Sequence, residues 1–495
     1  MSMSLARYSF LLLIGYFVGV RLLATSESAA ALVAAVRVGD QPQVLRLLDL
    51  GTNSNASTPD GTTALHWAVY RDSLELAAEL IQAGARVDSA NRYGVTPLML
   101  ACTNGNAHLV ALLLKAGADA NHASPGGETP LMMAARTGRP EPLRCLLANG
   151  ARTEAREDWH RQTALMWAAA EGHLSVVQAL LDAGAEVGTR TEGGFTAYLF
   201  AARQGHIDVV RQLLAAGVPV DQCLNSEDGK KNRTGPSALG LAVINAHFEL
   251  AAVLLDAGAD PNFTWDGRNI LHEITRVRRP GQGTNDPAPA GSGDLGSLDL
   301  VRKIVTHGAH LDARMTRSRA GVRTVLDLEG ATPFLLAART ADVELMKLLA
   351  ELGADPLLPN QDNTTPLLVA AGVGVQSPGE DPGSPEEVFE AVKIALDLGN
   401  DVNAVDNHGE TAMHGAAYKY AAAVVPLLVE RGAKIEIWNQ KNRLGWTPLR
   451  IATGVHRSMN LRSSPETATE LRRVMIAAGV STKVEPEMNI SGGTK

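Results

Sequence analysis

The sequence predicts an all-α protein, a solenoid of short repeats that each contain two helices, and three observations support this prediction. A tetrapeptide of the form Thr-x-Leu-x, or a close variant, returns about every 33 residues along much of the chain. Each copy is followed by two short apolar stretches with helical spacing. A glycine and a polar turn then separate one unit from the next, which is the pattern of a repeat array.

The composition agrees with such an array and limits the possible functions. With 495 residues the chain is too long for one ordinary core. Hydrophobic residues make up 45% and aromatic residues only 4%, so short aliphatic side chains must supply the core. The 45 Lys and Arg against 53 Asp and Glu give a net charge of −8, which provides no overall positive field for a polyanion. Nucleic acid is therefore not expected as a partner.

The repeats number about twelve by their starting residues. The clearest copies are spaced by 33, 33, 34 and 33 residues, weaker copies follow, and a degenerate first copy covers residues 30–55. The clear and weak copies begin at Thr63, Thr96, Thr129, Thr163, Thr196, Ser237, Asn269, Thr332, Thr365, Thr411 and Thr447.

Each element of one unit has a physical reason. The Thr hydroxyl can cap the first helix, and a proline such as Pro97 fits the first helical turn because no N–H is needed there. Paired alanines in the middle of this helix let neighbouring units approach closely. The second helix carries a stripe such as Val176, Val177, Leu180 and Leu181. A following glycine favours a left-handed end to that helix.

The pattern Thr-Pro-Leu-x-x-Ala-Ala, Gly-His, an aliphatic second helix and Gly-Ala-Asp resembles the ankyrin repeat over residues 30–480. The resemblance implies two antiparallel helices with an outward β-hairpin, stacked into a curved solenoid whose units share one core. It also implies a protein-binding scaffold without enzymatic activity. Partners of such arrays dock on the hairpin tips and on the exposed end of each first helix.

The domain organisation follows from the spacing. Residues 27–221 are expected to hold six regular repeats, and residues 222–480 to hold six more with insertions. Residues 481–495 are expected to be a disordered tail. The Gly/Pro/Ser-rich insertions at 281–296 and 377–385 separate the two helices of a unit, whereas those at 225–233 and 314–328 lengthen turns.

The N-terminal segment 1–26 has the order of a secretory signal. Arg7 precedes an apolar run over residues 8–20, and Ala24-Thr25-Ser26 supplies small residues for cleavage. The run is shorter than the ~20 residues that a spanning helix needs. We therefore expect export to the periplasm or the extracellular space, with an uncleaved membrane anchor as the alternative.

The sequence offers no catalytic, cofactor-binding or metal-binding constellation. Six histidines recur at two fixed positions of the repeat, so they are expected to serve the fold: His66, His272, His414, His173, His206 and His247. No phosphate loop, nucleophile elbow or Cys-x-x-Cys pair is found. We expect no enzyme and no cofactor; a sensor or an enzyme that uses the C-terminal insertions is the alternative.

One local zone is basic. Its residues lie in and around the insertions of the eighth and ninth repeats: Arg276, Arg278, Arg279, Arg302, Lys303, Arg314, Arg317, Arg319 and Arg323. We interpret the zone as a solvated insertion; a contact with an anionic surface or a polyanion is the alternative.

The candidate binding face is taken from the positions that the ankyrin resemblance leaves exposed. It contains Tyr70, Arg71, Arg92, Tyr93, Arg136, Trp159, His160 and Arg203. Tyr, Trp and Arg are the residues that dominate binding energy at protein interfaces. The face predicts a partner with an acidic, partly apolar surface. Trp67 and Trp167 are expected in the core instead.

Overall fold

The computed structural model describes residues 27–225, 234–280, 289–317, 326–375, 382–457 and 460–484. Within these ranges the protein is helical with few strands, so the predicted all-α fold class is confirmed. The chain divides into two compact units, formed mainly by residues up to 219 and by residues from 220 on, which we call unit 1 and unit 2. The predicted signal segment 1–26 and most of the predicted tail lie outside the described residues.

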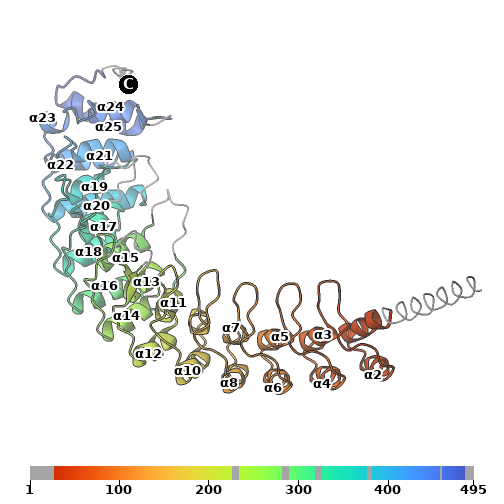
Figure 1. The fold of residues 1–495 in the computed structure, drawn as a ribbon. Helices are drawn as coiled ribbons and strands as arrows, with labels where there is room; N and C mark the ends of the chain where they lie inside the picture. Colours follow the sequence, from red (N-terminus) through yellow and green to blue (C-terminus); the bar gives the residue numbers. More distant parts are fainter. Residues whose placement is uncertain are drawn as a thin grey trace, which may run out of the picture. The chain divides into compact units, whose positions relative to one another are not determined.

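Unit 1 is a row of helix pairs. Residues 27–38 are helical and pair with α2 (Gln41–Asp49). The following pairs are α3 (Ala64–Tyr70) with α4 (Leu74–Gln82), α5 (Pro97–Asn104) with α6 (Ala107–Lys115), α7 (Pro130–Ala135) with α8 (Pro140–Ala148), α9 (Ala164–Ala170) with α10 (Leu174–Asp182), and α11 (Ala197–Gln204) with α12 (Ile207–Ala215). Within this unit each first helix packs against the next first helix, and each second helix against the next second helix (Figure 1).

Unit 2 continues the same design with additions. Its pairs are α13 (Ala238–Ile244) with α14 (Phe248–Asp256), α15 (Ile270–Arg278) with α16 (Ser297–Thr306), α17 (Pro333–Arg339) with α18 (Val343–Glu351), α19 (Pro366–Ala371) with α20 (Pro385–Asp397), α21 (Ala412–Lys419) with α22 (Val424–Glu430), and α24 (Pro448–Thr453) with α25 (Pro465–Ala477). The additions that the sequence pattern did not predict are α23 (Ile435–Trp438) and two hairpins, β1 (Cys223–Asn225) with β2 (Thr234–Ser237) and β3 (Val455–Arg457) with β4 (Asn460–Arg462).

The helix starts form as the residue types predict. Thr96 lies outside α5 in an extended conformation, and its hydroxyl accepts a hydrogen bond from the amide of Met99 at 3.3 Å. The same cap recurs at Thr129, Thr163, Thr196, Ser237, Thr332, Thr365 and Thr447. Such a cap satisfies one of the amides that a helix start leaves without a partner.

The core runs through the middle of the stack. The alanine pairs at the centre of the first helices are fully buried, as in Ala134 and Ala135, so the small side chains do allow close approach between units. The stripe of α10 is buried at Val176, Val177 and Leu180, whereas Leu181 is only half-buried. The stack therefore buries most of the first helices and one face of the second helices, and in unit 1 it leaves the ends of the first helices and the hairpins accessible.

Candidate functional site

The candidate binding face lies where the first helices of unit 1 end and where its hairpins project. Figure 1 shows the loops before α5, α7 and α9 extending beyond the first helices, away from the second helices. Seven of the eight predicted residues are exposed, and Arg203 is half-buried. Tyr70, Tyr93 and Trp159 are 64%, 58% and 78% exposed, which is unusual for large aromatic side chains. The eight residues form a row across successive repeats, and their role in binding stays a prediction.

Each hairpin tip of this row is fixed by hydrogen bonds. In the hairpin before α5, the side-chain oxygen of Asn91 accepts hydrogen bonds from the amides of Tyr93 and Val95 at 3.0 and 3.1 Å. The amide of Arg92 donates to the carbonyl of Asp60 in the preceding tip at 2.8 Å. The tips therefore support each other, and the aromatic side chains stand on an ordered backbone.

The hairpin that carries Trp159 differs from its neighbours. The spacing from Thr129 to Thr163 is 34 residues where the adjacent spacings are 33, and the extra residue lies in this turn. A buried glutamate, Glu157, replaces the usual Asn, Ser or Thr of the turn. Its carboxylate accepts hydrogen bonds from the amides of Trp159, His160 and Gln162 at 2.6, 2.9 and 2.9 Å. The longer turn thus pushes Trp159 outward while its backbone stays anchored.

Arg161 in the same turn has a backbone conformation that favours glycine. Its φ is +62°, and the equivalent residues of the neighbouring hairpins are Gly61, Gly94, Gly127 and Gly194, with φ between +75° and +82°. A side chain in this region costs roughly 1–2 kcal/mol. The protein therefore tolerates local strain beside its most exposed tryptophan.

Arginines of the row lie over aromatic rings. The guanidinium carbon of Arg136 is 4.9 Å from the ring centre of Trp167 in the next repeat. Arg203 lies 5.1 Å from the rings of both Phe195 and Phe200, and Arg92 lies 4.7 Å from that of Tyr93. Contacts of this kind stabilise exposed positions by about 0.5–1 kcal/mol and hold the cation in place.

The prediction that Trp67 and Trp167 belong to the core is wrong. Both side chains are only half-buried, and arginines lie over their rings, Arg37 over Trp67 at 5.1 Å. The physical reason is the helical register. Leu at the second position after the cap and the residues at the fifth and sixth face the core, and the fourth position lies at the edge of that face, where Trp67 and Trp167 are half-buried and Phe200 is buried. Sequence reasoning also missed Phe195, which the hairpin brings onto α11, where it stacks on Phe200.

The recurring histidines have structural roles, as predicted. His66 is buried, and its Nδ1 accepts a hydrogen bond from the amide of Thr63 at 3.1 Å. Its Nε2 lies 2.9 Å from the carbonyl of Val95, which can only accept, so the ring is neutral with its proton on Nε2. His272 and His414 repeat this arrangement in unit 2. Burial lowers the pKa of His272 and of His414 to about 4.

The second set of histidines links neighbouring repeats. The Nε2 atoms of His173 and His206 each lie 3.0 Å from a backbone carbonyl at the end of the preceding first helix, that of Arg136 and of Ala170. His247 instead lies with its Nδ1 2.8 Å from the hydroxyl of Ser292. Each ring thus has its own local partner, and no group of His, Cys, Asp and Glu that could hold a metal ion occurs among the described residues.

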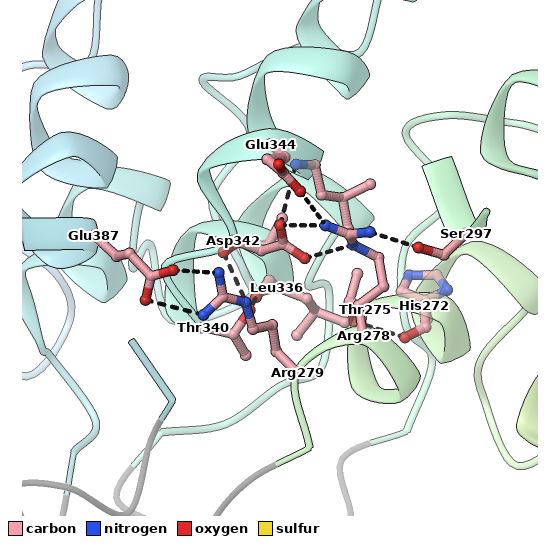
Figure 2. Close-up of polar contacts among 12 residues, drawn as sticks. His272, Thr275, Arg278, Arg279, Ser297, Leu336, Thr340, Asp342, Glu344 and Glu387 are labelled. Carbon is pink, nitrogen blue, oxygen red and sulfur yellow. Dashed lines mark hydrogen bonds and ion pairs between the residues drawn. The ribbon is translucent and has the colours of Figure 1, made fainter. Parts of the chain in front are cut away.

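Part of the basic zone of unit 2 is an ion-pair network, which corrects our interpretation for Arg278 and Arg279, whereas Arg276, Arg302, Arg314 and Arg317 are exposed. Figure 2 shows Arg278 and Arg279 reaching from the end of α15 to carboxylates of the next repeats. Arg278 donates to both oxygens of Asp342 at 2.7 and 2.9 Å, and to the hydroxyl of Ser297 at 2.5 Å. Asp342 is fully buried and caps α18.

The remaining charges of this zone are also largely paired. Arg279 donates to the two oxygens of Glu387 at 2.5 and 3.0 Å, and this contact lowers the pKa of Glu387 to about 2. The other described pairs are Arg276 with Glu273, Arg302 with Glu351 and Lys303 with Asp256. Arg319 and Arg323 lie outside the described residues. The pairing removes most of the free positive charge that a polyanion contact at the described part of the zone would need.

None of the described helices is both long and apolar enough to span a bilayer.

Comparisons with known proteins agree with the geometry. A family model of three ankyrin repeats matches residues 32–124, 109–191 and 188–265, and a single ankyrin repeat matches residues 329–361. Human ankyrin repeat and SOCS box protein 16 is 34% identical over 288 residues, 52% of this chain and 55% of the human protein.

Two further relatives share a smaller part. The E3 ubiquitin-protein ligase KEG of Arabidopsis thaliana is 24% identical over 37% of this chain, and neurogenic locus notch homolog protein 1 of Danio rerio is 31% identical over 31% of it. The chain spans about half the length of the human relative, and the matches cover 12% and 7% of the other two.

Proposed function

Because this chain belongs to the ankyrin-repeat family, we propose that it binds a partner protein through the hairpin tips and first helices of unit 1 and has no catalytic activity of its own. The observation that carries the proposal is the exposure of the Trp159 side chain on an ordered turn. Its side chain is 78% exposed on a backbone that a buried carboxylate fixes. An ordered, exposed aromatic residue loses little entropy on binding, which is how protein interfaces gain affinity.

The charges of the two units favour a partner with an acidic, partly apolar surface. In unit 2 the arginines of the ion-pair network are neutralised by carboxylates. In the described part of unit 1, by contrast, no carboxylate lies within ion-pair distance of Arg71, Arg92 or Arg136. Acidic side chains of a partner would complement these cations and speed its association.

The comparison with the relatives favours a binding role for this chain over a chemical activity that it would share with them. What they have in common with this chain is the repeat region, because the matches cover little of the ligase and of the notch homolog. A sensor or an enzyme that uses the insertions of unit 2 is the second candidate. Among the described residues, ionisable groups there form ion pairs and helix caps, which favours the scaffold.

We also propose that the array comprises twelve repeats and that the chain is exported. The helix pairs of the two units, described above, support the count. Arg7, the apolar run at 8–20 and Ala24-Thr25-Ser26 support export to the periplasm or the extracellular space. N-terminal sequencing of the extracted protein tests this: a start near Glu27 supports cleavage, and Met1 retained in a membrane fraction supports the anchor.

Affinity capture from the protein's own compartment tests the binding face. We expect Trp159→Ala and Arg136→Ala to weaken capture of the partner by about 1–3 kcal/mol each. Helix content and the melting midpoint should stay nearly unchanged, because both side chains are exposed. Leu357→Ala, at an exposed residue of unit 2, is the matched control.

A deletion of residues 314–323 tests the alternative, in which the partner docks on the insertions of unit 2. If capture survives the double replacement of Trp159 and Arg136 but is lost on this deletion, the partner docks on the insertions and the proposed face is wrong.

A further inference from the structure

One register position of the first helices is apolar in every regular repeat of unit 1 from the second repeat on. The fourth residue after the helix cap is Trp67, Leu100, Met133, Trp167 and Phe200 in five consecutive repeats. Phe200 is buried, and the other four, which we call the stripe, are half-buried. Since equivalent residues of stacked repeats lie on one face, the stripe is a row of partly accessible apolar side chains.

Unit 2 lacks an equivalent row among its described residues. At the same register, Leu241, Leu336, Val369 and Ile451 are buried, and the other two positions carry Glu273 and Gly415. Accessible apolar side chains in an unbroken row are therefore a property of unit 1. Solvent contact of large apolar groups in register is unfavourable for the free protein, and it is expected where another surface covers them.

Positive charge lies directly on this row. Arg37 and Arg136 place their guanidinium groups 5.1 and 4.9 Å from the ring centres of Trp67 and Trp167. The ring of Tyr70, 64% exposed, meets that of Trp67 edge to face at 5.7 Å. A segment lying on the stripe would thus bury its own apolar side chains against the rings and bring neighbouring residues beside guanidinium groups, which favours carboxylates there.

The spacing of the row limits the backbone of that segment. Packed helices lie about 8–10 Å apart, so consecutive stripe residues are separated by roughly that distance. An α-helix rises 1.5 Å per residue, and seven residues advance ~10.5 Å and return to nearly the same face. In a strand, side chains of one face recur every ~6.8 Å or ~13.6 Å, which lies further from this spacing than the helical repeat does. A polyproline helix advances ~9.3 Å in three residues, so it is the competing backbone that the test must separate from the α-helix.

We infer that the stripe binds one amphipathic α-helix of the partner, with apolar side chains seven residues apart and acidic side chains on both sides of them. Four stripe positions require a helix of about 22 residues, since three intervals of seven residues separate them. The inference rests on the proposed function and specifies its partner. It does not depend on Trp159, which lies on a hairpin tip.

Synthetic peptides added to the full chain test the inference. The first has 22 residues rich in Glu and Ala with Leu at every seventh position, and the second has the same composition with Leu at every fifth. A third carries Leu at every third position of a proline-rich acidic sequence, because a polyproline helix advances ~9.3 Å in three residues. We expect the first peptide to bind at least about tenfold more tightly than either of the others, measured by calorimetry.

Variants of the stripe must remove that preference. Leu100→Glu and Met133→Glu place good helix formers at half-buried positions, so both variants should fold. Each replacement should lower the affinity of the chain for the first peptide by about tenfold or more. Leu357→Ala in unit 2 should leave its affinity unchanged. Circular dichroism of each variant verifies the fold.

Four outcomes would each overturn the inference. They are equal binding of the first two peptides, tighter binding of the proline-rich peptide, no binding of any peptide, and unchanged binding of the first peptide by both Glu variants. The proposed function fails separately, through partner capture that is insensitive to Trp159 and Arg136. If that capture is sensitive but the heptad peptide shows no preference, the scaffold stands and only the helical partner is wrong.

Discussion

The guanidinium group of Arg278 binds the fully buried carboxylate of Asp342 in the next repeat through two hydrogen bonds of 2.7 and 2.9 Å. Asp342 caps the second helix of its repeat, which is the position that His173 and His206 occupy in unit 1. There the imidazole bonds to a backbone carbonyl at the end of the preceding first helix. The same junction between repeats is thus made by hydrogen bonds from histidine to the backbone at these two positions of unit 1 and by an ion pair here.

Removing Arg278 should strongly destabilise unit 2. Arg278→Ala leaves the carboxylate of Asp342 buried without its cation, and the loss of one partner of a buried pair costs about 3–5 kcal/mol. Arg302→Ala breaks the pair with Glu351, whose side chains are 54% and 64% exposed, and should cost less than about 1 kcal/mol. Denaturant unfolding of both variants measures the difference, and similar losses would show that Asp342 does not depend on Arg278.

The buried histidines should make the protein less stable in mild acid. The pKa values of His272 and His414 are lowered by burial from 6.5 to about 4. Between these values the unfolded chain binds more protons than the folded one, so stability is fully present above pH 6.5 and falls as the pH drops toward 4. Each ring can account for up to about 3 kcal/mol of this loss.

Thermal melts from pH 7 to pH 4 check this dependence. His272→Gln and His414→Gln lower stability at pH 7 but should reduce its slope with pH. The matched control is His310→Gln at an exposed position, which should keep the slope of the unmodified protein. A slope that the double replacement leaves unchanged would assign the acid sensitivity to other groups.

The helices and their ends were predictable because local chemistry determines them. The hydroxyl of Thr96 and the ring of Pro97 act within one helical turn, and the structure places α5 at these residues. Even the outward position of Trp159 has a signal in the sequence, the one additional residue between Thr129 and Thr163. The half-exposure of Trp67 could not be inferred in this way, because the same register position is buried at Phe200 and at Leu336.

The ion pairs of unit 2 could not be predicted in the same way. Arg278 and Asp342 are separated by 64 residues, and the intervening segment contains insertions with no repeat register. Nothing in the composition of the basic zone indicates that its arginines meet carboxylates of two later repeats. Pairings of this kind depend on the path of the inserted chain and on the stacking of whole repeats, which single-sequence patterns do not encode.

Replacing the strained Arg161 should stabilise unit 1. Arg161→Gly removes a side chain from a backbone with φ of +62° that glycine adopts freely, and we expect a gain of about 0.5–1 kcal/mol in the free energy of unfolding. The exposed contact of Arg161 with Asp158, at 4.0 Å, contributes little. Asn363→Gly at the equivalent turn of unit 2 should gain less, because asparagine tolerates this conformation. Loss of stability in Arg161→Gly would show that the side chain, and not the backbone, matters at this turn.

The carboxylate of Glu157 should support binding through Trp159. Glu157→Ala leaves the amides of Trp159, His160 and Gln162 without their acceptor, so the turn should loosen while Trp159 itself remains. We expect capture of the partner to weaken by about 1 kcal/mol, because the tryptophan must then be ordered on binding. The lost hydrogen bonds should also lower the free energy of unfolding by about 1–3 kcal/mol.

A matched replacement separates the two effects of Glu157. Asn360 has the same role in a hairpin of unit 2, where its side-chain oxygen accepts hydrogen bonds from the amides of Asp362 and Thr364 at 3.1 and 2.7 Å, but that tip carries no aromatic residue. Asn360→Ala should therefore lower stability without weakening capture. In the combination of Glu157→Ala with Trp159→Ala, the loss of binding should not exceed that of Trp159→Ala alone, because the carboxylate acts through the tryptophan. Additive losses in that double variant would show that Glu157 contributes to the interface on its own.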